Sequence, residues 1–334
     1  MQIILQTCDS KYIILEKIGY GATCSVFKGY SLVDNSHKIY AIKIFKEQYK
    51  KYYEKEVSIK KNFHSKFFLS LIKNGEGQIH QEQKNSSNLL PHKSLINISD
   101  KYNSKIFYEI EEIAENGELF NYVSELGKGF PEPISAKIFM KILKKVQILH
   151  ENCIIHGDIK TENILVGNDF DLKLIDFGFS QKINKKNNNI VNSTEGSDTY
   201  SSPEIRKVNI AGYDGIKSDI FSLGVLLFVI TVGRFPFNSS SFSDKKYRLI
   251  MIKKYDSFWA NFESYNLSSE FKHLINHLIC FEPKERLMIE QIMEHPWIKM
   301  NVKYNYLNKN ELFIDEDVVS ELKKRQEFMK KKAN

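Results

Sequence analysis

Apolar and polar residues alternate in short runs through the first third of the chain, a pattern that is typical of strands. The segment at 12–18 is apolar and ends at Gly19. We expect five strands here, at residues 12–18, 26–30, 39–45, 67–72 and 106–112. A charged stretch without Gly or Pro, residues 50–61, is expected to form a helix among them.

Residues 75–104 differ in composition from their surroundings. They are rich in Asn, Gln, Ser and His, and they contain Pro91. Such a segment offers few apolar side chains for a core. We therefore expect an inserted, poorly ordered loop over 75–104.

From Ser135 onward the apolar residues recur at helical spacing. Ile138, Ile142, Val146 and Leu149 form one stripe, and Ser135 is the expected N-cap of that helix. Residues 219–231 are apolar nearly all round, which indicates a helix buried in a core, and 268–279 repeats the amphipathic pattern.

These patterns predict an α+β chain of two lobes, with the change from strands to helices between residues 112 and 117. The β-rich lobe spans 12–112 and includes the loop at 75–104, and the helical lobe spans 117–298. An N-terminal extension, 1–11, and a basic C-terminal tail, 299–334, flank them.

Charge and composition narrow the function classes. The chain has 48 basic and 41 acidic residues, and this excess is spread out rather than gathered in a stripe, so we expect no specific nucleic-acid partner. No apolar stretch reaches the roughly 18 residues that a membrane span requires, and the start lacks the features of a signal peptide. Four isolated cysteines suit a reducing compartment, the cytoplasm or the nucleus.

The densest basic clusters, 323–325 and 330–332, lie in the tail behind the acidic residues 315–317. We expect a solvated amphipathic helix there. Two roles for the tail stay open, folding back on the helical lobe or binding a regulatory partner.

Two glycines stand between the first two strands, in the segment Ile18-Gly19-Tyr20-Gly21-Ala22-Thr23-Cys24-Ser25-Val26. Glycines let a backbone approach phosphate oxygens and direct amide N–H groups at them, although a plain hairpin turn would use them equally well. Lys43 follows on a half-buried strand. Burial of its ammonium group costs free energy unless the group pairs with an anion, so Lys43 is a candidate anion-binding residue. The alternative interpretation is a lysine on an edge strand whose side chain reaches solvent.

The strongest chemical signal is the segment at 154–166. Asp158, Lys160 and Asn163 stand on one loop between apolar segments, and Asp176 follows ahead of Gly178. Phosphoryl transfer requires oxygen ligands for Mg²⁺, a carboxylate that accepts a hydroxyl proton and a cation at the transferred group. A polar surface loop would not need this combination.

Together these segments resemble the eukaryotic protein kinase family, over residues 12–298. Four further segments are similar to family motifs: 112–120 to the hinge and the helix after it, 196–204 to the end of the activation segment, 218–225 to the central helix, and 283–287 to the late arginine motif. Phe258-Trp259 and His295-Pro296-Trp297 look most like the calcium/calmodulin-kinase-like branch. Lys160, two residues after Asp158, resembles the serine/threonine type.

The resemblance implies a role for each matching residue, with ATP and Mg²⁺ as cofactors and proteins as substrates. Asp158 would be the catalytic base and Lys160 the cation at the transferred phosphoryl group, while Asn163 and Asp176 would bind Mg²⁺. Lys43 would hold the ATP phosphates and pair with Glu56 in preference to Glu54. The remaining ATP-site residues would be Ile18, Gly19, Tyr20, Gly21 and Ala22 in the glycine loop, Val26, Ala41 and Leu165 around the adenine, the backbone of Glu112 and Ala114 at its edge, and Glu118 at the ribose.

Four positions depart from the family pattern. Gly157 replaces the arginine before the catalytic aspartate, and Cys24 replaces the third loop glycine. Glu111 falls at the gatekeeper position and Lys60 at a helix position, both of which are usually apolar.

The leading hypothesis is an ATP-dependent serine/threonine protein kinase. A pseudokinase scaffold and a small-molecule phosphotransferase are the alternatives. The four residues Lys43, Asp158, Asn163 and Asp176 weigh against the scaffold, and the segment at 196–204 weighs against a small-molecule substrate.

Overall fold

The computed structural model describes residues 2–33, 38–62, 68–82, 105–184, 187–207, 212–302 and 315–333. The chain divides into two compact units, Met1–Ala114 and Glu115–Asn334. Each unit is described by itself below.

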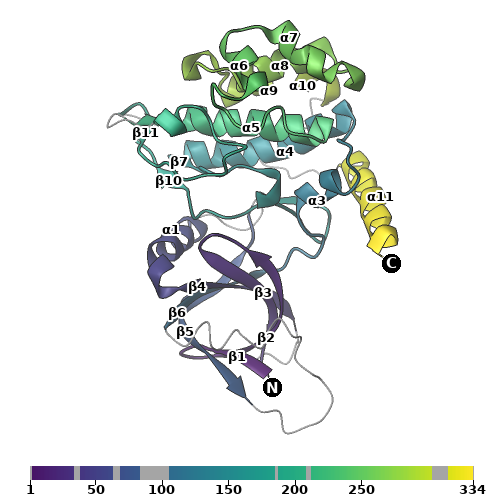
Figure 1. Ribbon diagram of the computed structural model, residues 1–334. Coiled ribbons are helices and arrows are strands. Elements are labelled where there is room, and N and C mark those ends of the chain that lie inside the picture. The colour runs from purple at the N-terminus through teal and green to yellow at the C-terminus, as the bar shows by residue number, and fades with distance from the viewer. Residues whose placement is uncertain are drawn as a thin grey trace. The chain divides into compact units, whose positions relative to one another are not determined.

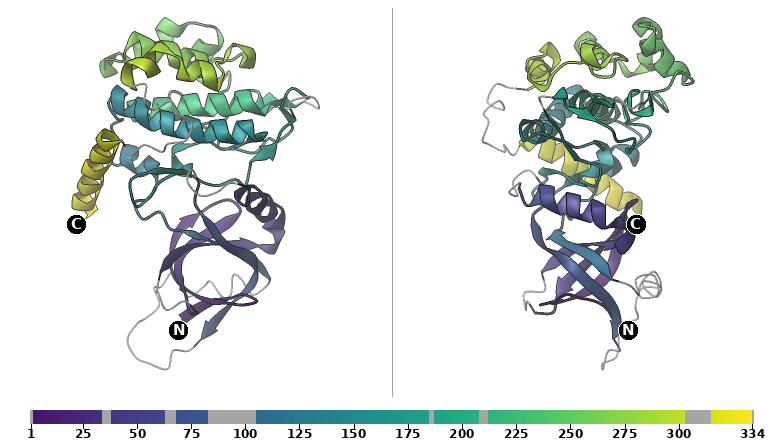
Figure 2. Two further views of the ribbon diagram at one scale, coloured as in Figure 1. Left: turned by 180° about the vertical axis from the view of Figure 1, so that it is seen from behind. Right: turned by 90° about the vertical axis from the view of Figure 1, so that its left-hand side faces the viewer.

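Six strands of the N-terminal unit close into a barrel in the order β1-β2-β3-β4-β6-β5 (Figures 1 and 2). Their bounds are β1 Gln2–Gln6, β2 Lys11–Tyr20, β3 Cys24–Ser31, β4 Ile39–Lys46, β5 Leu71–Glu82 and β6 Ile106–Glu112. Alternate residues of the strands point inward and fill the barrel with an apolar cluster that includes Phe27, Ile42, Ile44, Tyr108 and Ile110. The alternation in the sequence therefore marks the inner face of the barrel.

The structure corrects two expectations for this unit. β1 lies within the expected extension 1–11, yet it pairs with both β2 and β5 and closes the barrel. β5 carries the first part of the expected loop 75–104 as regular strand, and residues 83–104 lie outside the described part of the chain. Between residues 75 and 81 only Gly77 and Ile79 are buried. The other residues of this part of the strand are polar and more exposed, so its composition resembled that of a loop.

Helix α1, Lys50–Lys60, packs on the outer face of the barrel. Tyr53 and Val57 of α1 contact Phe45 of β4 and Phe107 of β6. Because Phe45 and Phe107 alternate with the inward-facing isoleucines, the outer face of β4 and β6 is the face that α1 covers.

The C-terminal unit is mainly helical (Figure 1). Its helices are α3 Leu119–Ser124, α4 Glu132–Glu151, α5 Gly215–Val232, α6 Lys245–Met251, α7 Tyr255–Trp259, α8 Ser269–Leu278, α9 Ile289–Met293, α10 Pro296–Asn301 and α11 Glu316–Ala333. Short strand pairs join β7 Ile154–Ile155 to β10 Gln181–Lys182, β8 Ile164–Val166 to β9 Leu172–Leu174, and β11 Ile190–Val191 to β12 Tyr213–Asp214.

Helix α5 is the core of this unit. By length and composition it could cross a membrane, but 94% of its apolar window is buried inside the protein. It contacts α4 and α8. The all-round apolar pattern of 219–231 therefore reflects a core helix.

Two serines near helix starts differ in their roles. Ser268 caps α8, because its hydroxyl accepts a hydrogen bond from the N–H of Phe271. The expectation that Ser135 caps α4 is wrong. The helix begins at Glu132, three residues earlier, and the Ser135 hydroxyl donates to the carbonyl of Phe130 inside the core.

The tail forms α11, which packs against α3 and α4. Val318 and Leu322 are buried, whereas Lys323, Lys324 and the lysines at 330–332 are exposed. Of the two roles left open, the structure has the tail folded back on its own unit. Arg325 is buried, so the expectation of a solvated basic cluster is wrong for this residue.

Candidate active site

In the N-terminal unit, the glycine segment comprises the end of β2 (Ile18, Gly19 and Tyr20), the turn at residues 21–23 with Gly21 and Ala22, and the start of β3. Gly19 pairs with Val26 across the two strands, and the N–H of Gly21 donates to the carbonyl of Cys24 over 3.0 Å. A Cβ built on Gly21 would meet no atom closer than 3.8 Å, so the protein itself leaves room for a side chain there. The missing side chain instead keeps the backbone accessible, which suits a turn that approaches a phosphate.

Lys43 and Glu56 form a buried ion pair in the same unit. Lys43 stands on β4 and Glu56 on α1, and Nζ lies 2.5 Å from Oε1. Burial by itself would raise the pKa of the Glu56 carboxyl, but the charges of Lys43 and Lys60 outweigh it and lower the pKa to about 2. Glu54 is exposed and pairs with Lys50 instead. Glu56 is thus the carboxylate that Lys43 contacts.

In the C-terminal unit, Asp158 is held on several sides by the loop that carries it. Its Oδ2 accepts hydrogen bonds from Lys160 Nζ, over 2.7 Å, and from Asn163 Nδ2, over 3.1 Å. Its Oδ1 accepts one from the backbone N–H of Ser197, over 3.0 Å. A carboxylate oxygen has two lone pairs, so within the described part of the chain Oδ1 can still accept a hydroxyl proton.

Lys160 joins this loop to the segment at 196–204. Its ammonium group donates to Asp158 and also to the hydroxyl of Ser197, over 2.7 Å. Thr161 adds a second link, since its hydroxyl lies 2.8 Å from that of Tyr200. The sequence placed Ser197 in a motif but gave no sign that it would contact both Asp158 and Lys160, because the contact joins segments about 40 residues apart.

Asp219 of α5 holds the backbone before Asp158. Its two oxygens accept from the N–H groups of His156, over 2.9 Å, and Gly157, over 3.0 Å, and Oδ2 also lies 2.8 Å from His150 Nε2. His156 in turn accepts at Nδ1 from the N–H of Asp158 and donates from Nε2 to the carbonyl of Ile175. A buried helix therefore fixes the loop, and the loop fixes the residue before Asp176.

Asn163 and Asp176 offer oxygen ligands that suit a hard cation. Asn163 uses its Nδ2 for Asp158, which leaves its Oδ1 without a hydrogen-bond partner among the described residues. Asp176 adopts φ +65° and accepts from the N–H of Gly178 at Oδ1, while its Oδ2 likewise has no partner in the described ranges. An amide oxygen and a carboxylate oxygen are the donors that Mg²⁺ prefers, so these residues fit the ion.

The other predicted nucleotide-site residues divide between the units. Val26 lies on β3 and Ala41 on β4, and the segment of Glu112 and Ala114 ends the N-terminal unit. Leu165 lies on β8, where it pairs with Glu118, the residue before α3. Burial and the charge of Glu162 raise the pKa of Glu118, against the opposing charge of Lys160.

The model of the family described as protein kinase domain matches residues 12–298. The chain belongs to the protein kinase family. The predicted α+β kinase fold is confirmed.

Three relatives illustrate the similarity. Serine/threonine-protein kinase kin-29 of Caenorhabditis briggsae is 36% identical over 61% of this chain and 24% of its own. CBL-interacting protein kinase 5 of Oryza sativa subsp. japonica is 34% identical over 60% and 41%. Carbon catabolite-derepressing protein kinase of Candida tropicalis is 31% identical over 70% and 37%. The chain thus spans less than half of the length of these relatives, which bear out the calcium/calmodulin-kinase-like branch.

One departure from the kinase pattern has a backbone reason. Gly157 adopts φ +78°, a conformation that favours glycine. A Cβ on this residue would lie 2.7 Å from the carbonyl oxygen of Phe179. This kinase therefore cannot take the usual arginine there without moving its backbone.

Glu204 and Arg286, from the segments at 196–204 and 283–287, form an ion pair in the C-terminal unit. Arg286 Nη1 and Nη2 lie 2.5 and 2.8 Å from Glu204 Oε1 and Oε2. The buried guanidinium also donates to the carbonyls of Cys280, Lys217 and Phe281. This pair joins three segments of the kinase lobe and contacts none of the residues assigned to catalysis.

Proposed function

We propose that this chain is an ATP-dependent serine/threonine protein kinase, which transfers the γ-phosphate of ATP to hydroxyl groups of protein substrates. The observation that carries the proposal is the arrangement around Asp158, whose carboxylate is oriented by Lys160, Asn163 and the N–H of Ser197. A carboxylate held in this way can accept the proton of a substrate hydroxyl, while Lys160 stabilises the charge on the transferred group.

ATP and Mg²⁺ are the cofactors of this proposal. Mg²⁺ bound by Asn163 and Asp176 would neutralise phosphate charge. In the N-terminal unit, Lys43 would contact the phosphates while Glu56 keeps it oriented, and the Gly19–Gly21 turn would offer backbone N–H groups.

The link between Lys160 and Ser197 favours a protein substrate. It ties the catalytic loop to the segment at 196–204, which resembles the end of an activation segment. In protein kinases that segment belongs to the lobe that receives the substrate chain, and a small-molecule phosphotransferase has no need of it. We infer that the partners of this site are proteins with exposed Ser or Thr residues.

The test is a phosphotransfer assay with purified chain, Mg²⁺, labelled ATP and a generic basic protein. Phosphoserine and phosphothreonine should appear in the basic protein. Asp158→Asn should reduce turnover by at least about a thousandfold, because it removes the proton acceptor. Lys43→Met should keep the fold and lose most turnover.

Three results would contradict the proposal. If Asp158→Asn were as active as the wild type, the activity would come from elsewhere. If the wild type bound ATP without transferring phosphate to any protein, the pseudokinase alternative would replace it. Phosphate transfer to small alcohols alone would indicate a small-molecule phosphotransferase.

A further inference from the structure

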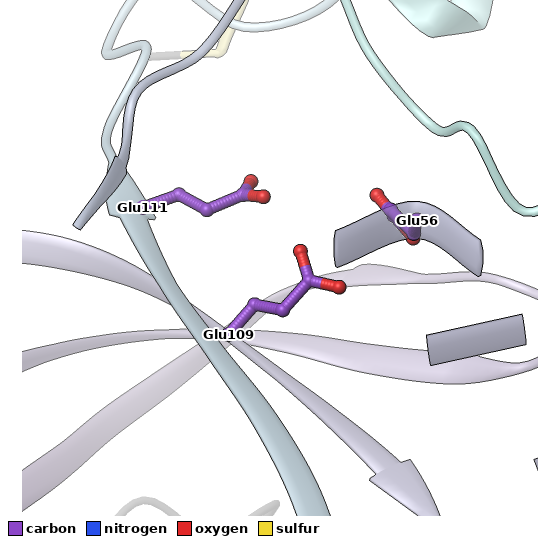
Figure 3. A group of neighbouring side chains, drawn as sticks. All are labelled: Glu56, Glu109 and Glu111. Carbon is purple, nitrogen blue, oxygen red and sulfur yellow. The ribbon is translucent and has the colours of Figure 1, made fainter. Parts of the chain in front are cut away.

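The face of β4 and β6 that α1 covers carries three buried charged residues, Lys43, Glu109 and Glu111. β4 and β6 pair so that Lys43 lies opposite Glu109 and Ala41 opposite Glu111. Directly opposite residues point to the same face of a sheet, and residues two apart on one strand do as well. Glu109 and Glu111 therefore both face α1, and Figure 3 shows their carboxylates directed toward Glu56.

Lys60 of helix α1 forms ion pairs with these carboxylates. Glu56 and Lys60 are four residues apart and so lie on one face of the helix. Lys60 Nζ lies 2.6 Å from Glu56 Oε1 and 2.7 Å from Glu109 Oε2, and it also pairs with Glu111. Glu56 Oε1 accepts from Lys43 as well, over 2.5 Å. All five side chains are buried.

The charges in this network nearly balance. Two ammonium groups face three carboxyl groups, and burial together with the negative charge of Glu56 raises the pKa of Glu109 well above its usual value, against the charge of Lys60. Glu109 is thus the carboxyl most prone to keep its proton. The three carboxylates would otherwise suit a metal ion, but Lys60 already contacts all three, so its ammonium takes the place of a cation.

Directional contacts distinguish this network from an apolar one. Apolar contacts between a helix and a sheet tolerate small rotations and shifts, because dispersion and burial depend little on direction. Charged hydrogen bonds are short and directional, and a buried charge that loses its partner is costly. The ion pairs of Lys60 with Glu109 and Glu111 of β6 therefore fix the rotation of α1 on the barrel. That rotation sets the position of the Glu56 carboxylate relative to Lys43.

We propose that Lys60 is a positioning residue, which clamps α1 to Glu109 and Glu111 of β6 and so holds Glu56 in contact with Lys43. The proposal rests on the proposed kinase function for its catalytic consequence, but the clamp itself concerns the N-terminal unit alone. In this kinase the orientation of Lys43 depends on an ion network that includes Lys60 and Glu111. The family usually has apolar side chains at both of these positions.

The structural test is hydrogen–deuterium exchange of the α1 amides in the full chain. Lys60→Met should speed exchange over 50–60 at least tenfold, while β2 and β3 stay protected. Lys61→Met is the matched control, because Lys61 is adjacent and exposed, and it should leave exchange unchanged. Equal protection in Lys60→Met and Lys61→Met would overturn the clamp. If Lys60→Met does not fold, Glu111→Gln removes one ion pair at nearly constant shape, and the same comparison decides.

The catalytic test is a double-mutant cycle with Glu56→Gln, using protein whose folded fraction has been checked by circular dichroism. If Lys60 acts through Glu56, Lys60→Met should lower kcat at least tenfold in the wild type and less than twofold in Glu56→Gln. A merely structural role would give equal losses in both backgrounds, which would overturn the positioning role. If the wild type transfers no phosphate, the proposed function fails, whereas the exchange experiment still decides on the clamp.

Discussion

The guanidinium of Arg325 in α11 lies over the ring of Phe130, with its carbon 3.7 Å from the ring centre. Its N–H groups also donate to the carbonyls of Tyr122, Lys128 and Gly129, at 2.7 to 2.9 Å. The Tyr122 carbonyl belongs to the last turn of α3, where a helix leaves acceptors unpaired, and those of Lys128 and Gly129 lie in the segment between α3 and α4. One tail residue thus satisfies the backbone of a segment about 200 positions earlier.

Arg325→Ala should therefore destabilise the C-terminal unit. The change removes the cation–π contact and leaves three carbonyls short of a donor, which should cost about 2–4 kcal/mol in the free energy of unfolding. Urea unfolding would measure it. Lys324→Ala is the control, since Lys324 is exposed and should change the value by less than about 0.5 kcal/mol. Similar losses in both variants would show that Arg325 does not anchor α11.

Activity should not require phosphate at Ser193, which lies three residues before Gly196 at the position where the family usually has its phosphosite, or at its neighbour Thr194. Most of the family has an arginine before the catalytic aspartate that pairs with a phosphorylated activation loop, and Gly157 offers neither charge nor side-chain donor. Two lysines of this unit could supply a substitute cation. Lys173 pairs with Asp171, and Lys182 is exposed on β10.

The corresponding experiment compares the Ser193→Ala/Thr194→Ala variant with phosphatase-treated wild type. Both should stay within about threefold of the untreated enzyme. A loss of tenfold or more, about 1.4 kcal/mol in barrier, would show that the loop switch works without its arginine.

Gly157→Arg should not restore the switch. A side chain at φ +78° is strained, and its Cβ would meet the Phe179 oxygen, so the loop that carries Asp158 would have to move. We expect at least a tenfold loss of kcat and a lower Tm. Phosphate-dependent activation of a stable Gly157→Arg enzyme would refute this expectation.

Lys145 gives the stability of this chain a defined pH dependence. It is buried in α4, and burial, with the charges of Lys141 and Lys173, lowers its pKa to about 7. An unfolded lysine titrates near about 10.4, so between about pH 7 and 10 the unfolded chain binds the extra proton. Stability from this group therefore rises with pH in that window and is lowest below pH 7.

Lys145→Met should consequently be more stable than the wild type near pH 7, and the advantage should shrink by up to about 1.4 kcal/mol per pH unit toward pH 10. Urea unfolding of both proteins at pH 6.5, 8 and 9.5 would show the trend. A constant difference between them would mean that Lys145 keeps its ordinary pKa.

The sequence alone determined which residues meet in the loop at 158–163 and which face of the strands lines the barrel. Asp158, Lys160 and Asn163 lie within six positions, so a single loop conformation brings them together. Strand alternation is equally local, and it separated Ile42 and Ile44 inside the barrel from Lys43 and Phe45 outside. Short-range geometry sufficed for these features, because the spacing of side chains along a strand or a tight loop is nearly fixed.

Only the tertiary structure decided which distant residues meet. The departures at Lys60 and Glu111 were visible in the sequence, but Lys60 contacts Glu109 and Glu111 only because α1 packs on β6. The closing strand β1 and the burial of Arg325 likewise depend on segments about 75 and 200 residues away. From the sequence alone, an isolated charged residue is predicted to lie on the surface. Whether it is buried depends on whether folding brings it enough donors, acceptors and opposite charges to offset the loss of water.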